Sequence, residues 1–356
     1  MRIVFAGTPE FAVPTLEALQ ASTHEILAVY TQPDRPAGRG QKMRASAVKQ
    51  AALARGLPVI QVEDFKSPQA MEVLQSLRAD AMVVVAYGLL LPQAVLDLFG
   101  AACWNLHASL LPRWRGAAPI ARAIEAGDLQ TGVAVMKMER GLDTGGVLMQ
   151  IEETITPEDS TQSLQARLAL LGAGLMVEAI DRVERLLQAG QPIEAVLEPQ
   201  SSSGIVYAAK LRKDEARLDF TQPAQQLERK MRAFDPTPGC LTWYLPPSPD
   251  AAPQMLKCWR GRVQPMPVGQ TTDQACKERG QTYEERSQRG AFVQPGLVIG
   301  FGADGPLIAC GADCLELREV QAAGGLRQPA SRWASQVQLR LGDRLGDPGI
   351  ADRVGA

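Results

Sequence analysis

The sequence contains very few histidines and no paired cysteine motif. Only two of its 356 residues are histidines, His24 and His107, and its six cysteines form no Cys-x-x-Cys pair. Zinc sites are built mainly from Cys and His at short, regular spacings. The sequence therefore predicts no metal site, and we expect the cysteines to be reduced structural thiols of the kind found in cytoplasmic proteins.

Long apolar runs are also missing. No apolar stretch reaches the roughly 18–20 residues that a helix needs to span a bilayer. Residues 1–5 already have the pattern of a buried strand, which leaves no room for a signal or transit peptide. We therefore expect a cytoplasmic protein with no membrane partner. We also expect a monomer.

Charge is scarce in net terms, but it is unevenly distributed. The net charge is −2, yet residues 209–356 hold 20 Lys and Arg against 17 Asp and Glu, so the excess of acid lies in the first 208 residues. A basic C-terminal part is compatible with a polyanion partner, although excess charge also simply solvates a surface. A chain of 356 residues is long for one hydrophobic core and suits two domains.

Residues 1–188 alternate between strand and helix patterns. Short apolar runs at 2–6, 25–31, 80–86 and 101–106 resemble buried parallel strands. Helical patterns at 13–21, 45–54 and 69–77 separate them, two further strands are expected at 132–138 and 147–153, and a long helix at 160–187. This order predicts an α/β fold with a doubly wound, mainly parallel, Rossmann-like sheet.

The composition and the pattern of expected elements change after residue 188. Residues 189–206 are rich in Gly, Pro and Ser and are expected to form a linker. Residues 207–356 contain one helical stretch, 224–233, and short strand-like pieces separated by Gly and Pro, which favours a small β-barrel. Residues 264–291 are polar and suggest a loop inserted between two barrel strands.

Two polar side chains at the end of one buried strand suggest catalysis. Asn105 and His107 are two residues apart, so they project from the same face of the strand. An amide donor and an imidazole on one face can stabilise an oxyanion and move a proton. Asp143, in the glycine-flanked loop 141–145, is a candidate carboxylate partner of His107.

Several motifs resemble the folate-dependent formyltransferases, in particular the members that act on a charged tRNA. The first is Asn105–His107 followed by Ser109–Pro112 and the rest of the run to Pro119. The others occur in the same order along the chain, at residues 5–10, 31–40, 84–89, 141–145 and 232–239. The resemblance implies transfer of a formyl group from 10-formyltetrahydrofolate, a co-substrate with no tightly bound cofactor, to the amino group of methionine on initiator methionyl-tRNA. It also implies that the C-terminal barrel has an oligonucleotide/oligosaccharide-binding-like (OB-like) fold.

The resemblance assigns roles to individual residues. Asn105, His107 and Asp143 would be catalytic. The tRNA acceptor end would meet Arg39, the most important charge, with Arg35 and Lys42 in the same loop. Near the C-terminus, Leu326 stands where the family often has a lysine. The residues that would contact folate are Tyr87, Gly88, Ser109, Leu110, Leu111 and Pro112.

Two alternatives remain open. A formyltransferase acting on a small amine would share the Asn105, His107 and Asp143 set, but it needs neither the basic loop nor the C-terminal barrel. A non-catalytic RNA-binding module would leave the three polar residues unexplained. A serine nucleophile is not expected, because the second histidine, His24, lies in a polar turn and is expected to be exposed.

Overall fold

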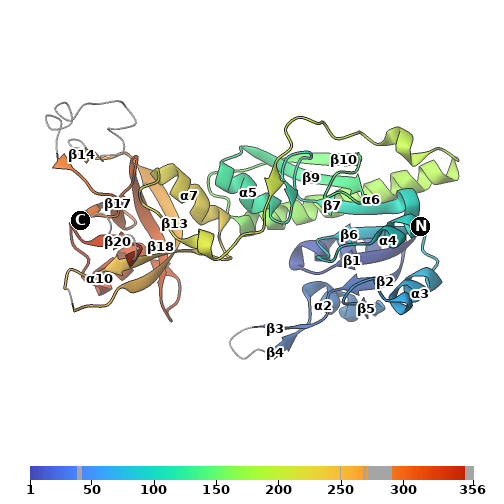
Figure 1. The fold of residues 1–356 in the computed structure, drawn as a ribbon, viewed down its shortest axis with the longest axis horizontal. Coiled ribbons are helices and arrows are strands. Elements are labelled where there is room, and N and C mark those ends of the chain that lie inside the picture. The colour runs from blue at the N-terminus through green and yellow to red at the C-terminus, as the bar shows by residue number, and fades with distance from the viewer. Residues whose placement is uncertain (38–41, 249, 268–269, 272–290, 349–356) are drawn as a thin grey trace. The chain divides into compact units, whose positions relative to one another are not determined.

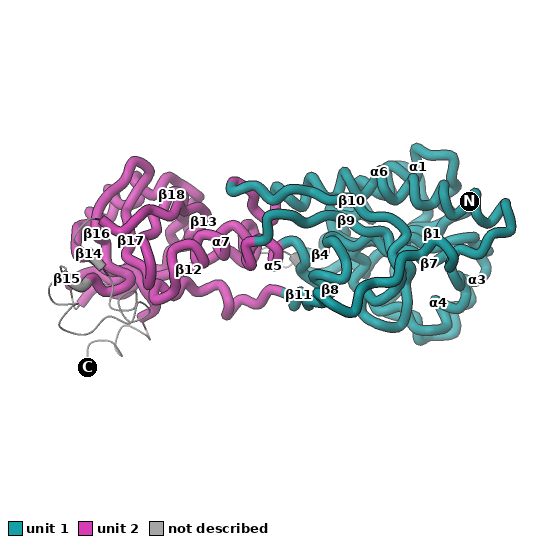
Figure 2. The backbone as a smooth tube through the Cα atoms, turned by 90° about the horizontal axis from the view of Figure 1, so that it is seen from above, with its two compact units in different colours: residues 1–120, 128–157, 163–210 teal, residues 121–127, 158–162, 211–356 magenta. Residues whose placement is uncertain are grey.

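The structure is a computed structural model and describes residues 1–37, 42–248, 250–267, 270–271 and 291–348. These residues form two compact units (Figure 2): residues 1–120, 128–157 and 163–210 in one, and residues 121–127, 158–162 and 211–356 in the other. The second unit includes residues 121–127 and 158–162, which come before residue 188 in the sequence. The predicted boundaries of the functional domains at residues 188 and 207 therefore stay a prediction.

The first unit is built on a seven-stranded sheet in the order β10-β9-β7-β6-β1-β2-β5 (Figure 1). The five strands β7, β6, β1, β2 and β5 are parallel to one another. At one edge of the sheet, β9 is antiparallel to β7, and β10 is antiparallel to β9. The sheet strands are β1 (Arg2–Gly7), β2 (Glu25–Thr31), β5 (Val59–Gln61), β6 (Ala81–Val85), β7 (Cys103–His107), β9 (Gln130–Lys137) and β10 (Val147–Thr154).

Helices and short ladders complete the elements around this sheet. The α-helices are α1 (Val13–Ala21), α2 (Ala47–Ala54), α3 (Pro68–Ser76), α4 (Gln93–Phe99), α5 (Pro119–Ala126) and α6 (Thr161–Gln188). Single 3₁₀ turns occupy Glu10–Ala12, Gly100–Ala102 and Ile193–Val196. The short strands are β3 (Arg35–Ala37), β4 (Lys42–Arg44), β8 (Arg115–Gly116) and β11 (Tyr207–Ala208).

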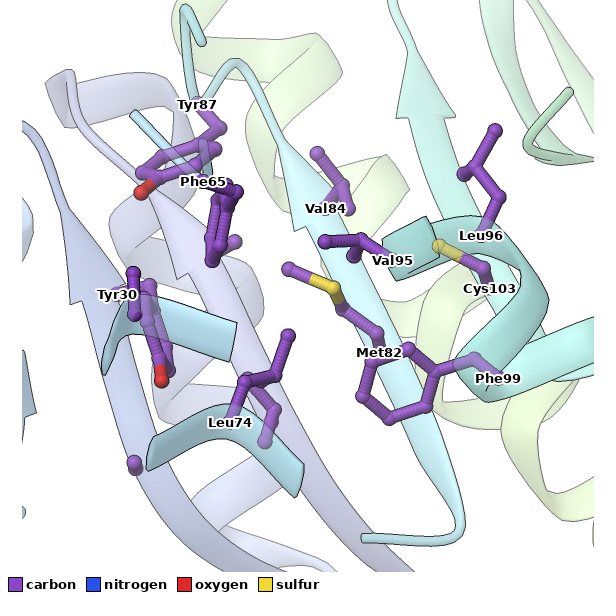
Figure 3. Packing of buried hydrophobic residues seen from close by; sticks show 14 residues of the cluster. Tyr30, Phe65, Leu74, Met82, Val84, Tyr87, Val95, Leu96, Phe99 and Cys103 are labelled. Carbon is purple, nitrogen blue, oxygen red and sulfur yellow. The ribbon is translucent and has the colours of Figure 1, made fainter. Parts of the chain in front are cut away.

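Burial explains the pattern of the central strands. Every residue of β6 is buried, as expected for a parallel strand covered on both faces, whereas the edge strand β10 begins with two buried residues and then alternates between half-buried and exposed residues. On one face, Met82 and Val84 of β6 pack with Val95 and Phe99 of α4 (Figure 3). This close packing fixes the strand ends from which the candidate site projects.

Helix α6 is long and apolar enough to cross a membrane by length and composition, but half of its most apolar window is buried inside the protein. Its inward side includes Leu168, Gly172 and Met176. A Cβ at Gly172 would lie only 2.6 Å from Leu106, so glycine allows α6 to approach β7 closely. The helix therefore acts as a core helix that braces the strand carrying Asn105 and His107.

The second unit is an antiparallel sheet in the order β16-β17-β18-β13-β12-β20, with β19 paired to β18. Two backbone hydrogen bonds link its two ends: Val298 of β16 donates to Asp343, next to β20, at 2.8 Å, and Leu345 of β20 donates to Gly296, just before β16, at 2.8 Å. Its elements are a 3₁₀ turn (Asp214–Ala216), α7 (Ala224–Ala233), β12 (Cys240–Leu245), β13 (Gln254–Gln264), β14 (Gln270–Thr271), β15 (Ala291–Phe292), β16 (Val298–Phe301), β17 (Pro306–Ala309), β18 (Cys314–Ala322), β19 (Gln328–Pro329), α10 (Ala330–Gln336) and β20 (Arg344–Gly346).

The predicted fold class is confirmed: a mainly parallel α/β sheet is followed by a small, curled antiparallel barrel. The predicted helices 13–21 and 224–233 match α1 and α7 residue for residue. Most of the predicted insertion at 264–291 lies outside the described residues. The five described cysteines are unpaired and buried, as expected for structural thiols.

Candidate functional site

The candidate site lies at the carboxyl end of β7, in the middle of the sheet. Within β7, Asn105 stands opposite Val84 of β6 and Met136 of β9, and His107 stands opposite Ala134 of β9. The two polar side chains therefore project from the same face, as the strand periodicity predicts. Residues in the loops that follow β7 and β9 contact His107.

The two nitrogens of the His107 ring have different partners. Nε2 lies 2.9 Å from the carbonyl oxygen of Trp114, and because a carbonyl only accepts, Nε2 carries a proton and donates it. Nδ1 lies 3.6 Å from Oδ2 of Asp143. In a neutral ring the Nδ1 lone pair faces this carboxylate, and a proton on Nδ1 converts the repulsion into attraction. Nδ1 is thus the ring atom placed to exchange a proton.

Asp143 is held in an unusual backbone conformation. Its φ is +50°, which is uncommon for a residue other than glycine. Its Oδ2 accepts a hydrogen bond from the backbone N–H of Gly116 at 2.8 Å. Such conformations persist where the surroundings fix them, and they concentrate at functional sites. The structure thus brings together His107 and Asp143, which are 36 positions apart in the sequence.

A network centred on Asp128 holds the segment after His107 in place. Its carboxylate accepts from Nε1 of Trp114 at 2.7 Å and from Nε and a terminal nitrogen of Arg113, both at 2.7 Å. Ser109 closes the same turn by donating from Oγ to the carbonyl of Arg113 at 2.7 Å. Trp114 in turn supplies the carbonyl that orients His107. The basic-aromatic pair Arg113–Trp114 and the Ser109 hydroxyl therefore contribute to the scaffold of the site.

The side-chain amide of Asn105 is half-buried. Among the residues that the structure describes, no hydrogen bond or ion pair engages this amide. An amide N–H group left accessible beside an imidazole can donate to an oxyanion.

The turn after β6, where two folate contacts are predicted, is held in place through the backbone of Tyr87. The Tyr87 side chain is 1% exposed and packs in the core near Phe65, and burial raises the pKa of its hydroxyl (Figure 3). Its carbonyl accepts from Thr8 Oγ1 at 2.7 Å and from Gln32 Nε2 at 3.0 Å. A folate contact at Tyr87 therefore has to involve the backbone. Gly88 has a φ of +81°, and a Cβ there would lie 2.2 Å from Gln32 Nε2, so no other residue fits without a shift.

The other predicted folate contacts follow directly from β7. Leu111 is buried in a small apolar cluster with Ala134, Met136 and Val147. Leu110 and Pro112 are half-buried. These residues belong to the turn that directly follows His107 in the chain.

The predicted tRNA-contacting loop forms a two-stranded hairpin, β3 and β4, whose residues Arg35 and Lys42 are exposed. Arg39 lies outside the described residues. At the base of the hairpin, Asp34 is bound by Lys49 at 2.8 Å, and this contact holds the pKa of the Asp34 carboxyl below its usual value. The basic charges are therefore presented on an anchored, solvent-exposed element.

One sequence expectation is wrong: His24 is buried, with 6% exposure. It contacts α6, with Nε2 at 3.2 Å from Asp181 and Nδ1 at 3.8 Å from Glu184. The polar turn around His24 folds against the charged end of the helix, which local sequence does not reveal. These three residues lie close enough together to hold a metal ion, so the absence of a metal stays a prediction.

Sequence reasoning missed Gln200, which belongs to the predicted linker. Its Nε2 donates to the backbone carbonyls of Asp143 and Gly145, both at 2.8 Å. Its Oε1 accepts from Arg115, which is also held by β11 through the backbone. A single glutamine in a Gly/Pro/Ser-rich stretch carries no sequence signal of this role.

Two family models match the chain. The model described as formyl transferase matches residues 1–180, and the model described as formyl transferase, C-terminal domain, matches residues 210–338. The first covers the sheet, the Asn105–His107 strand and the Asp143 loop. The second covers most of the barrel.

Similar proteins agree with these models. The methionyl-tRNA formyltransferase of Thiobacillus denitrificans is 46% identical over 97% of this chain and 100% of its own length, and that of Hydrogenovibrio crunogenus is 43% identical over 97% and 99%. The structure of HypX from Aquifex aeolicus in complex with tetrahydrofolic acid has a TM-score of 0.56 at 14% identity, covering 96% of this chain and 48% of that one. That of WlaRD, a sugar 3N-formyl transferase, has a TM-score of 0.55 at 16% identity, covering 92% and 99%. The chain belongs to the formyl transferase family.

Proposed function

We propose that this enzyme transfers the formyl group of 10-formyltetrahydrofolate to the α-amino group of methionine on initiator methionyl-tRNA, which yields N-formylmethionyl-tRNA for translation initiation. The observation that carries the proposal is identity of 43–46% over 97% of the chain to relatives named methionyl-tRNA formyltransferase. The folate is a co-substrate that is consumed in each turnover. We expect a cytoplasmic enzyme, because charged tRNA is used there.

In the proposed mechanism the methionine amine attacks the formyl carbon, and the carbonyl π electrons move to oxygen. Asn105 and a protonated His107 donate hydrogen bonds to that oxyanion, which lowers the barrier. When the tetrahedral intermediate collapses, the bond from carbon to N10 of the folate breaks. The amine loses a proton and N10 gains one. Asp143, 3.6 Å from His107, stabilises the imidazolium and relays the proton through water.

The other assignments follow from the same proposal. The catalytic domain comprises residues 1–188, residues 189–206 connect it onward, and the barrel at 207–356 binds tRNA. Turn residues Gly88 and 109–112 line the folate site together with the Tyr87 backbone. We expect no catalytic metal, and a monomer in solution.

The hairpin of β3 and β4 favours a charged tRNA as the acceptor of the formyl group. Arg35 and Lys42 are exposed on β3 and β4, and Arg39, which we expect to matter most, falls between these strands in the sequence but outside the described residues. Exposed cations on a projecting element suit the phosphates of an RNA end. A small-amine acceptor has no need for such an element.

A formylation assay tests the proposal. Purified protein is given 10-formyltetrahydrofolate with charged initiator tRNA, charged elongator methionyl-tRNA or free small amines. We expect rapid formylation of the initiator only. Formylation of an amino sugar nucleotide or glycinamide ribonucleotide in preference to tRNA would support the small-amine alternative, and binding of tRNA without turnover would support a non-catalytic RNA-binding module.

A further inference from the structure

Gln200 uses its complete hydrogen-bonding capacity beside the candidate site. Its Oε1 accepts from Nε and from a terminal nitrogen of Arg115, at 3.0 and 2.7 Å. Its Nε2 donates to the carbonyls of Asp143 and Gly145, both at 2.8 Å. A primary amide offers two donors and one oxygen with two lone pairs, so all four positions are filled. The reversed orientation would place N–H against guanidinium and oxygen against carbonyl oxygen, so only this orientation is compatible with the partners.

Arg115 strengthens this arrangement. Arg115 is buried, with 6% exposure, and its guanidinium donates two hydrogen bonds to the neutral amide oxygen of Gln200. A cation on the oxygen polarises the amide and makes its N–H groups better donors. The Arg115 backbone N–H donates to Val206 at 2.9 Å, so the glutamine and its anchor are both tied to the segment that follows α6.

The two carbonyls that Gln200 binds belong to the loop that presents Asp143. The tip of this loop, residues 139–142, is exposed. Asp143 itself has a positive φ, and its carboxylate lies 3.6 Å from Nδ1 of His107, just beyond hydrogen-bond distance. A small movement of the loop would therefore change the contact between carboxylate and imidazole. Gln200 holds the backbone carbonyl of Asp143 itself and that of Gly145, two residues further along the loop.

Other contacts hold the linker backbone without Gln200. Glu198 exchanges two backbone hydrogen bonds with Val147, at 2.9 and 2.8 Å. The ladder between β8 and β11 adds further backbone bonds. Removing the Gln200 amide therefore leaves the linker backbone in place and removes only the hydrogen bonds from Gln200 to the Asp143 loop.

We propose that Gln200 is a positioning residue for formyl transfer, which fixes the Asp143 loop so that the carboxylate faces His107. The proposal rests on the proposed function for its kinetic consequences, but its structural consequence stands apart from activity. The segment predicted as a linker is then part of the catalytic machinery, and the chain between the sheet and the barrel contributes to the reaction as well as connecting two parts.

The decisive variant is Gln200→Glu. It keeps the size of the side chain and the acceptors for Arg115, but it places oxygen in front of the carbonyls of Asp143 and Gly145. Gln200→Ala removes the amide without adding repulsion and carries the test if the glutamate variant does not fold. Gln191→Glu is the matched control, because it makes the same change at an exposed position of the same segment.

We expect Gln200→Glu to lower kcat by about 10- to 100-fold, the usual cost of displacing a catalytic group by roughly 1 Å. The KM for 10-formyltetrahydrofolate and the KM for methionyl-tRNA should change less than about threefold, since ground-state binding is retained. In an Asp143→Asn background, Gln200→Glu should change kcat by less than about threefold, because residues that act through one group are not additive. A full additional loss in that background would overturn the proposal, as would unchanged kcat in the single variants.

The structural readout uses the two histidines. In a protein labelled with ¹⁵N-histidine, only His24 and His107 give ring signals, and a His24→Asn variant assigns them. We expect Gln200→Glu and Asp143→Asn to move the His107 signals while Gln191→Glu does not, with His24 as the internal reference. Unmoved His107 signals in the Gln200 variants would overturn the proposal. If the wild-type chain does not formylate methionyl-tRNA, the proposed function fails, and this readout still decides whether Gln200 positions Asp143.

Discussion

Removing the charge of Asp143 is the sharpest test of the site. Asp143→Asn keeps the shape of the side chain and leaves an oxygen that can still accept from the N–H of Gly116. What it removes is a negative charge 3.6 Å from Nδ1 of His107. The variant therefore separates the charge of Asp143 from its role in packing.

The expected magnitude follows from Coulomb's law. At 3.6 Å, two unit charges interact by about 1.2 kcal/mol in bulk water and about 4.6 kcal/mol at an effective dielectric constant of about 20. The side chains of His107 and Asp143 are 7% and 16% exposed, so the true value lies between these limits. Since about 1.4 kcal/mol corresponds to tenfold in rate, loss of the charge should lower kcat by roughly 10- to 10³-fold.

The assay measures formylation of charged initiator tRNA together with the affinity for 10-formyltetrahydrofolate, which should stay near that of the wild type. Asp97→Asn, the same change at a carboxylate on α4 that binds only Gln93 in the described structure, is the control and should have no effect. Turnover within threefold of the wild type in Asp143→Asn would refute the argument that the carboxylate acts on His107 through its charge.

Three further predictions concern the oxyanion donors, the basic residues of the predicted tRNA-contacting loop and the buried thiols. Asn105→Ala and His107→Ala should each lower kcat by about 10²–10³-fold, because each removes a donor to the oxyanion, and near-normal single-turnover rates in either variant would contradict that role. The variants Arg35→Ala, Arg39→Ala and Lys42→Ala should each weaken tRNA binding and leave the affinity for folate unchanged. Each should also reduce the slope of the logarithm of the tRNA binding constant against the logarithm of the salt concentration by about 1. Filter-binding titrations at several salt concentrations measure this slope, and slopes equal to that of the wild type would show that these residues do not contact phosphates. Burial raises the pKa of the Cys103 and Cys240 thiols to about 12, so both thiols stay protonated below that pH. After iodoacetamide treatment at pH 8, mass spectrometry should find both cysteines unmodified in the native protein and alkylated in the unfolded protein. Rapid alkylation of the native protein would contradict their burial.

The sequence by itself determined the architecture and the pair of polar side chains on β7 to which we assign catalysis. Short apolar runs such as 81–85 favour buried strands, and the two-residue period of a strand places Asn105 and His107 on one face whatever surrounds them. These are local consequences of side-chain chemistry and backbone geometry. The same local logic gave α1 and α7 their limits.

Only the tertiary structure decided which distant groups meet. The 3.6 Å approach of Asp143 to His107 depends on a loop with a positive φ held by the Gly116 N–H and by Gln200, and none of these contacts is local in sequence. His24 shows the same limit, because its burial depends on Asp181 and Glu184 of α6, more than 150 residues away. Side-chain pattern fixes the face of a strand, whereas a hydrogen bond between distant loops depends on how the whole chain packs.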